Sequence, residues 1–245
     1  KNNMNYFKIV VAVWLAFPLS AWAAEKIYFN ERGQLLTNSS AAAYERQYNA
    51  VGDRAKVQDF YYPSKKKHSD PYEVMLTDVK AFVPKLPNGT LTLWHDNGNR
   101  KMVAGYRNGV PHGMWTNWYP EGTMSAQMPY VNGKTEGTGS RYYRNGRKES
   151  EIQFRNDKAE GVHKQWYPSG RPKSESVIHN DHVVQMISWE ESGRLTSELS
   201  IKNGKRSGVV LEWYPDGSKK TEAVYEDDEL VGRNRWDANG EVLEE

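Results

Sequence analysis

The chain has no cysteine among its 245 residues, so no disulfide stabilises it and no thiol can act as a nucleophile or metal ligand. Leucine, isoleucine and valine are sparse, whereas nine tryptophans and fifteen tyrosines are present. No Gly-x-Ser-x-Gly elbow, phosphate-binding loop or dinucleotide fingerprint occurs. This composition excludes thiol catalysis and predicts sheets packed by aromatic columns in place of a thick aliphatic core.

The first 23 residues differ from everything that follows. Lys8 precedes an apolar run at 9–17, and Ala21-Trp22-Ala23 has the small-x-small pattern of a signal-peptidase site. We expect residues 1–23 to be a secretory signal peptide cleaved after Ala23, which makes the protein periplasmic, secreted or envelope-associated. An uncleaved N-terminal anchor is the alternative. Cleavage leaves 31 basic and 31 acidic residues, a neutral balance that argues against nucleic acid as a partner.

An aromatic-x-x-x-Gly element recurs through the chain at intervals of 23 or 24 residues. A fixed period of this size is typical of repeat architectures. The predicted structural positions are six tryptophans, with Tyr142 as the exception in their column, and seven glycines. They are Trp94, Trp118, Trp166, Trp189, Trp213 and Trp236, and Gly98, Gly122, Gly146, Gly170, Gly193, Gly217 and Gly240.

Two kinds of tight turn alternate within each period. In Tyr214-Pro215-Asp216-Gly217 the proline presets φ and the glycine accepts a positive φ. About ten residues after each such glycine comes an Asn-Gly or related pair, such as Asn132-Gly133, which predicts a β-hairpin. Short connections between strands of this kind predict an all-β fold, an elongated antiparallel meander of stacked β-hairpin repeats with a period of about 24 residues.

We expect three parts: the signal peptide at 1–23, an irregular N-terminal capping segment with diverged repeats at 24–88, and the hairpin array at 89–245. In the capping segment, Tyr28 to Gly33 and Tyr61 to Lys65 resemble diverged units. The Ala-rich stretch within 38–56 is the place where we expect a short helix or an irregular insertion. A cap fits here because the end of a repeat array must cover or protect its edge.

Parity from the turn glycines divides the strand residues between two faces. We expect the tryptophans to share an apolar face with the residues six and eight positions after each glycine, such as Ile152 and Phe154. The opposite face is expected to carry aligned tyrosines and carboxylates, which form the candidate binding surface for a basic partner or for sugars. A solvated sheet face with tyrosines filling the pleat is the alternative. The candidates are Tyr119, Tyr143, Tyr167, Tyr214, Glu151, Glu175, Glu198 and Glu222.

No catalytic residue, metal site or cofactor is predicted. His179 and His182 flank a position where the other units have a hairpin turn, so we interpret them as surface histidines and not as metal ligands. The acidic run Glu226 to Glu229 also occupies a hairpin position, and it lacks the alternating ligands and glycine of a calcium loop. Asp and Glu are abundant along the whole chain, which leaves a paired-carboxylate hydrolase as an alternative without singling out any position.

The arrangement resembles the MORN-repeat family, in the bacterial variant found in YwqK-type antitoxin repeat proteins. The resemblance rests on the W-Y-P-x-G elements at Trp118, Trp166 and Trp213 and on Tyr106 to Gly113, and it covers about 89–240 well and 25–88 weakly. It implies stacked β-hairpins, roles in binding and scaffolding, and no catalytic residue. The sequence departs from the family pattern at three places, Lys65, Asn180-Asp181 and Gln185.

Three function classes follow. The first is an exported, non-enzymatic protein-binding scaffold, with an antitoxin-like or immunity-like role as its specific form, whose partner is a toxin or an envelope protein. The second is a repeat protein that binds cell-wall glycan or membrane lipid through its aromatic columns. The third is an enzyme, which the repeat pattern disfavours because no position is chemically singled out. No cofactor is implied by any of them.

Overall fold

The computed structural model describes residues 24–243 and contains two antiparallel sheets. The expected cleavage site after Ala23 lies outside the described residues. The first sheet has the strand order β2-β1-β3-β4-β5 and is followed by one turn of 3₁₀ helix, η2 (Leu76–Asp78). Its strands are β1 (Glu25–Phe29), β2 (Leu35–Leu36), β3 (Tyr44–Val51), β4 (Arg54–Tyr61) and β5 (Tyr72–Met75).

The second sheet has 15 strands; its main path runs in chain order from β6 to β20, and the two-residue strands β8 and β11 pair beside it with β7 and β10. The prediction of an all-β antiparallel meander is therefore confirmed. Its strands are β6 (Asn88–Trp94), β7 (Arg100–Arg107), β8 (Val110–Pro111), β9 (Gly113–Trp118), β10 (Met124–Val131), β11 (Lys134–Thr135), β12 (Gly137–Tyr142), β13 (Lys148–Arg155), β14 (Lys158–Trp166), β15 (Pro172–His179), β16 (His182–Trp189), β17 (Leu195–Lys202), β18 (Lys205–Trp213), β19 (Lys219–Glu226) and β20 (Glu229–Arg235).

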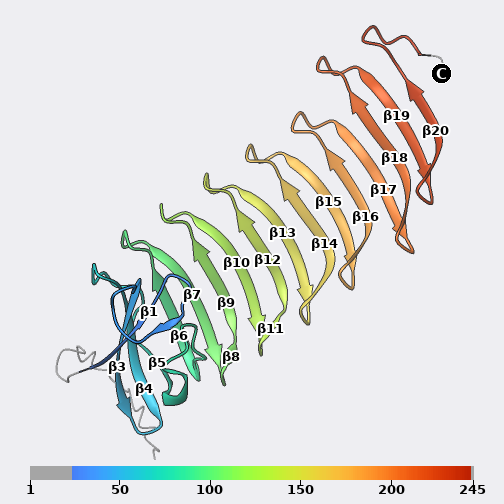
Figure 1. Cartoon of the computed structure of the whole chain (residues 1–245). Coiled ribbons are helices and arrows are strands. Elements are labelled where there is room, and N and C mark those ends of the chain that lie inside the picture. The colour runs from blue at the N-terminus through green and yellow to red at the C-terminus, as the bar shows by residue number, and fades with distance from the viewer. Residues whose placement is uncertain (1–23, 244–245) are drawn as a thin grey trace, which may run out of the picture.

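The array is an elongated single ribbon of curved strands, with the first sheet at its N-terminal end (Figure 1). Within residues 24–243, no second layer of strands or helices covers the array beyond that end. Most of its side chains are consequently half-buried on both faces. Stability in such a structure comes from contacts between neighbouring units, because there is no central core that all units share.

The two turn types have the geometry that the sequence predicts. At the first, the N–H of Gly122 donates to the carbonyl of Tyr119, and the φ of Gly122 is +95°. At the second, Asn132 and Gly133 both have positive φ, as the tight hairpin requires. The departure Asn180-Asp181 forms the same turn, with φ values of 48° and 66°. Asp and Asn tolerate this region better than other non-glycine residues, so the turn survives the loss of its glycine.

The stretch within 38–56 forms no helix, contrary to the expectation of a short helix there. Residues Tyr44–Val51 form β3, which pairs with β1 on one side and with β4 on the other. The alanines at 41–43 belong to the turn before this strand. The run of alanines is too short to build a helix, and pairing on both edges determines the conformation instead.

The apolar core lies where the first sheet meets the start of the array. It joins Val57 and Val74 of the first sheet with Leu86, and continues to Leu91 on β6 and Ala104 on β7. The segment 68–70 runs along the outer edge of β6, where the N–H of Asp70 donates to Thr92 and the N–H of Trp94 donates to His68. This contact covers the first edge of the array, which would otherwise be open to pairing with other chains.

A buried ion pair lies inside the first sheet. The guanidinium of Arg46 is fully buried and contacts both carboxylate oxygens of Asp59, at 2.7 and 3.0 Å. It also donates to the backbone carbonyls of residues 79, 81 and 82, and the hydroxyl of Tyr72 donates to Asp59 at 2.7 Å. Every strong polar group in this cluster therefore has a partner, which is the condition under which buried charges are tolerated.

His68 is buried beside this cluster among three aromatic rings, those of Tyr44, Tyr61 and Phe82, with ring centroids 4.8 to 6.4 Å away. Its Nδ1 atom has no hydrogen-bond partner among the described residues. Burial lowers the pKa of His68 to about 4, although the charge of Asp59 opposes the shift. A protonated imidazole is disfavoured here because the aromatic enclosure offers no replacement for its hydration.

Candidate binding surface

Strand register places the tryptophans on the face opposite to the one expected. In β14, His163 pairs with Ile152 of the column six residues after the glycine, whereas Lys164 pairs with Glu175. Trp166 follows Lys164 by two residues, so strand alternation puts it on the face of Glu175 and away from Ile152. The expectation that the tryptophans share a face with the aliphatic columns is wrong.

The same alternation holds along the array, and it defines two faces. The tryptophan face carries Trp94, Trp118, Trp166, Trp189, Trp213 and Trp236 together with Glu151, Glu175, Glu198 and Glu222. The aliphatic face carries the columns six and eight residues after each glycine, which include the buried Ala104, Ile178, Leu199 and Ala223. The error arose at the β-bulge that directly follows each tryptophan's pairing partner, because an extra residue there shifts the parity counted from the glycine.

Basic side chains lie over most of the tryptophan rings. The guanidinium of Arg100 is 5.3 Å from the ring centroid of Trp118, and the ammonium of Lys219 is 5.3 Å from that of Trp236. Lys148 over Trp166 and Arg194 over Trp213 repeat the contact at longer range. These cation–π contacts hold the side chains of successive units together, and they occupy ring faces that a sugar would need for stacking.

The glutamates of the tryptophan face are partly paired with lysines. Glu222 accepts from Lys219 at 2.6 Å, Glu151 from Lys148, and Glu175 lies 3.4 Å from Lys164 across the strands. Glu198 has no ion pair within residues 24–243 and lies between Ile187 and Val209 on its two neighbouring strands. From β15 to β18 this face therefore alternates carboxylates with aliphatic side chains along the array axis.

The four candidate tyrosines form a ladder between units. Each hydroxyl donates to the backbone carbonyl at the tryptophan-column position of the next unit, over 2.8 to 2.9 Å. The pairs are Tyr119 to Tyr142, Tyr143 to Trp166, Tyr167 to Trp189 and Tyr214 to Trp236. Tyr61 makes the same contact with Trp94 from the first sheet, and His95 replaces the tyrosine against Trp118.

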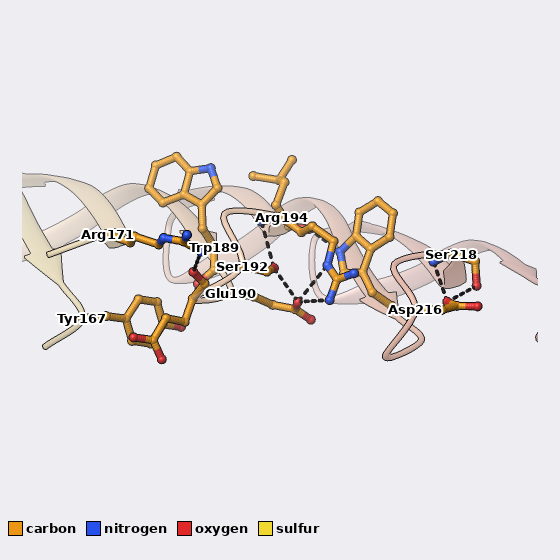
Figure 2. A network of polar contacts seen from close by, with 11 residues as sticks. Tyr167, Arg171, Trp189, Glu190, Ser192, Arg194, Asp216 and Ser218 are labelled. Carbon is orange, nitrogen blue, oxygen red and sulfur yellow. Dashed lines mark hydrogen bonds and ion pairs between the residues drawn. The ribbon is translucent and has the colours of Figure 1, made fainter. Parts of the chain in front are cut away.

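This ladder gives the tyrosines a structural role that their sequence spacing did not predict. Tyr167 points away from the ring of Trp189 while its hydroxyl reaches the Trp189 backbone (Figure 2). The series is interrupted at Glu190, which occupies the tyrosine position but pairs with Arg194 at 2.9 Å (Figure 2). Because the tyrosine hydroxyls are engaged, the glutamates are the better candidates for contact with a partner.

Removing one rung of the ladder tests this role. We expect Tyr167→Phe to lower the free energy of unfolding by about 1 kcal/mol, because it leaves the carbonyl of Trp189 without its donor. Tyr130→Phe is the matched control, since the hydroxyl of Tyr130 makes no hydrogen bond within residues 24–243 and its change should be close to zero. Urea unfolding of both variants measures the difference, and equal losses would contradict the ladder.

The candidate metal positions are occupied by local hydrogen bonds. The Nδ1 of His179 contacts Glu160 at 2.8 Å, and the Nδ1 of His182 contacts the carbonyl of Asn180 at 2.7 Å. In the acidic run 226–229, Asp228 pairs with Arg206 of the preceding turn at 2.7 Å. Residues 24–243 contain no group of three or more side chains arranged to hold a metal ion.

Sequence reasoning missed the side chains that join the units. Lys148 and Lys219 each pair with the glutamate three positions later in the chain and also lie over a tryptophan ring of the next unit. The same lysine–glutamate–tryptophan contact therefore occurs twice. The spacing Lys-x-x-Glu after the turn glycine was visible in both units and is the signal that would have found it. At the turn edge, Arg144 pairs with Glu121 of the preceding unit at 2.7 Å.

The fold and its contacts define a protein built from antiparallel β-hairpin repeats. Two segments, 111–132 and 135–156, match the family model described as "MORN repeat variant". The matches support a MORN-repeat family, whose repeats are non-enzymatic modules that bind proteins or membrane lipids. No curated protein matches the chain.

Solved structures add little. The crystal structure titled TcdB2-TccC3-Cdc42 is 13% identical with a TM-score of 0.24, and the alignment covers 88% of this chain and 12% of that one. Alternansucrase in complex with isomaltononaose is 11% identical with a TM-score of 0.18, covering 80% and 16%. This chain thus spans less than a fifth of either structure, and at these scores the similarity defines neither fold nor function.

Proposed function

We propose that the chain is an exported, non-enzymatic scaffold that binds a partner protein through the tryptophan face of its repeat array, in an antitoxin-like or immunity-like role. The observation that carries the proposal is the row in which carboxylates and aliphatic side chains alternate across neighbouring strands: Glu175, Ile187, Glu198 and Val209. A surface of this composition complements a partner that presents basic and apolar groups in alternation.

The cation–π contacts favour a protein partner over a glycan. A sugar ring binds a tryptophan by stacking on its face, and basic side chains of this chain already lie over the rings of Trp94, Trp118, Trp166, Trp213 and Trp236. A protein partner needs no free ring face, because it can use the exposed carboxylates instead. The side chain of Glu175 is 42% exposed even with Lys164 beside it.

Export forms part of the proposal and rests on the sequence of residues 1–23. Within residues 24–243 no helix is long and apolar enough to cross a membrane. The mature protein is expected to begin at Ala24, and N-terminal sequencing of material recovered from the native envelope checks this start. The same preparation then serves for the binding experiment.

The double variant Glu175→Lys with Glu198→Lys tests the binding surface. We expect it to lower capture of the native partner from crosslinked envelope about tenfold or more, because reversed charges repel a basic surface. Its melting temperature should stay nearly unchanged, since Glu198 is exposed and Glu175 is only half-buried at the sheet surface. Asp96→Lys with Glu226→Lys makes the same change of charge at the two turn edges and is the matched control.

Each outcome decides between the function classes. Equal capture by the wild type and both double variants would contradict binding through the tryptophan face. Retention on purified cell wall or on liposomes, with no protein captured, would favour the glycan- or lipid-binding alternative. A captured protein that is lost only with Glu175→Lys and Glu198→Lys supports the proposal, and its activity as a toxin would decide the antitoxin-like role.

A further inference from the structure

The two ends of the array differ in how their edges are covered. At the N-terminal end the segment 68–70 runs along β6, but β20 at the other end pairs only with β19 over most of its length. The chain after β20 returns to it at one point, where Trp236 bridges Val242 and the N–H of Leu243 donates to the carbonyl of Arg235 at 2.9 Å. Residues 230–234 therefore have an outer edge that no described residue covers (Figure 1).

The outer edge offers backbone groups for pairing. Because the carbonyl of Arg235 accepts from Leu243, it points away from β19. In an antiparallel sheet, alternate residues direct both their N–H and C=O groups to the same side. The N–H and C=O of Arg233, two residues earlier, consequently point outward as well and are available to an added strand.

Basic side chains line the same edge. Arg233 and Arg235 lie with Lys220 and Tyr225 around a shallow hollow of about 400 Å³ on the aliphatic face of the last strands. Glu212 in this hollow is engaged, since it accepts from the hydroxyl of Thr221 at 3.0 Å and lies 3.9 Å from Lys220. Within residues 24–243, Arg233 and Arg235 have no ion pair, so neither cation has a described carboxylate partner beside this edge.

We propose that the outer edge of β20 accepts an extended acidic segment of a partner protein as an additional strand, with two carboxylates, one residue apart, paired to Arg233 and Arg235. Main-chain hydrogen bonds supply the affinity in this mode of recognition, and alternate side chains supply the specificity. The inference rests on the proposed role as a protein binder and adds a second contact surface to the tryptophan face.

The charges along β20 determine which end of the strand the acidic part of the bound segment must face. The acidic run 226–229 lies at the hairpin end of the strand, whereas Arg233 and Arg235 lie at the opposite end. A bound segment must therefore place its carboxylates toward Arg235 and neutral or basic residues toward Glu229. A segment that is acidic along its whole length meets repulsion at the hairpin end.

The probe is a fluorescent peptide of about eight residues, a length that matches a short strand. Threonines and valines alternate along it, and near one end two glutamates are separated by a single residue. We expect Arg233→Ala in the full mature chain to weaken its binding about two- to fivefold, the effect of one cross-strand ion pair. Arg233→Pro should weaken it about two- to tenfold further, because proline also removes the outward N–H. An edge strand tolerates proline where its N–H faces solvent, so the fold should persist.

A peptide with lysines in place of the glutamates is the matched control, and we expect it not to bind. Equal affinities of the alanine and proline variants, or binding of the lysine peptide as tight as that of the glutamate peptide, would overturn the inference. Should Arg233→Pro unfold the array, the alanine variant and the lysine peptide still decide it. A wild-type dimer that Arg233→Pro converts to a monomer in sedimentation would assign the edge to a second copy and likewise overturn it.

Capture of the native partner separates this inference from the proposed function. If the wild type captures a partner and Arg233→Pro captures it equally, the edge inference fails and the protein-binding role stands. If the wild type captures no protein from the native envelope, the proposed function itself fails.

Discussion

Replacing Asp59 by asparagine will lower the free energy of unfolding by about 3 to 5 kcal/mol, the range measured when one partner of a buried ion pair is removed. Asparagine has nearly the same shape, so packing is preserved and only the charge is lost. Arg46 then remains as a buried cation whose carbonyl partners cannot neutralise it. Burial alone would lower the pKa of Arg46, but its hydrogen bonds to Asp59 and the charge of that carboxylate raise it.

Urea unfolding of the mature chain measures this change. Glu121→Gln is the matched control, because it removes the carboxylate of the exposed pair with Arg144 and should change stability by about 1 kcal/mol or less. A loss for Asp59→Asn as small as that of the control would mean that water hydrates Arg46 and that the first sheet is looser than its packing indicates.

The second large effect is a loss of stability as the pH falls from about 6.5 to about 4. His68 has a pKa of about 4 in the folded chain, below the ordinary value near 6.5, so the unfolded chain binds its proton first as the solution is acidified. The contribution of His68 is fully present above pH 6.5 and is lost progressively as the pH falls to about 4. Its full size is about 3 kcal/mol.

His68→Phe isolates this contribution, because phenylalanine fills the aromatic enclosure and cannot titrate. The groups that act on His68 are Asp59, which raises its pKa, and Lys101, Arg46 and His95, which lower it. Burial also lowers the pKa of His163, so the wild type retains some pH dependence from the array. Urea unfolding at a series of pH values should show a flatter profile for the variant, and parallel profiles would contradict the assignment.

The turns of the array could be predicted from the sequence because the residues that form them are local. Gly122 and Asn132 each lie in a backbone conformation that few other residues adopt, and a few neighbouring residues determine each turn. Once both turn types are placed, strand lengths and antiparallel order follow, and this is why the meander could be predicted without any knowledge of side-chain contacts.

The faces of the sheet could not be predicted with the same certainty, because parity depends on every residue between the turn and the position of interest. One extra residue at the bulge opposite Trp166 was enough to exchange the faces. The roles of the tyrosines were missed for a different reason. A hydroxyl that reaches a carbonyl in the next unit, as in Tyr167, involves residues 22 positions apart, and no local pattern marks such a contact.

The buried cluster of the first sheet was equally invisible. Arg46 and Asp59 are 13 residues apart on paired strands, and both residue types are normally exposed, so nothing in the sequence distinguishes them from surface charges. His68 presents the same difficulty, since its enclosure is built from Tyr44, Tyr61 and Phe82 of three separate segments. Contacts of this kind are fixed by tertiary packing and emerge only when the strands are placed.

The ladder that runs from each tyrosine to the following unit makes the length of the molecule a modular quantity. Each rung joins only adjacent units, as in Tyr143 to Trp166, so no unit depends on its distance from either end. Tandem duplication of one period in the gene would insert two strands and lengthen the ribbon by about 10 Å. The covered edge at β6 and the open edge at β20 would not change. Evolution can therefore adjust the reach of this protein in fixed steps without redesigning its termini.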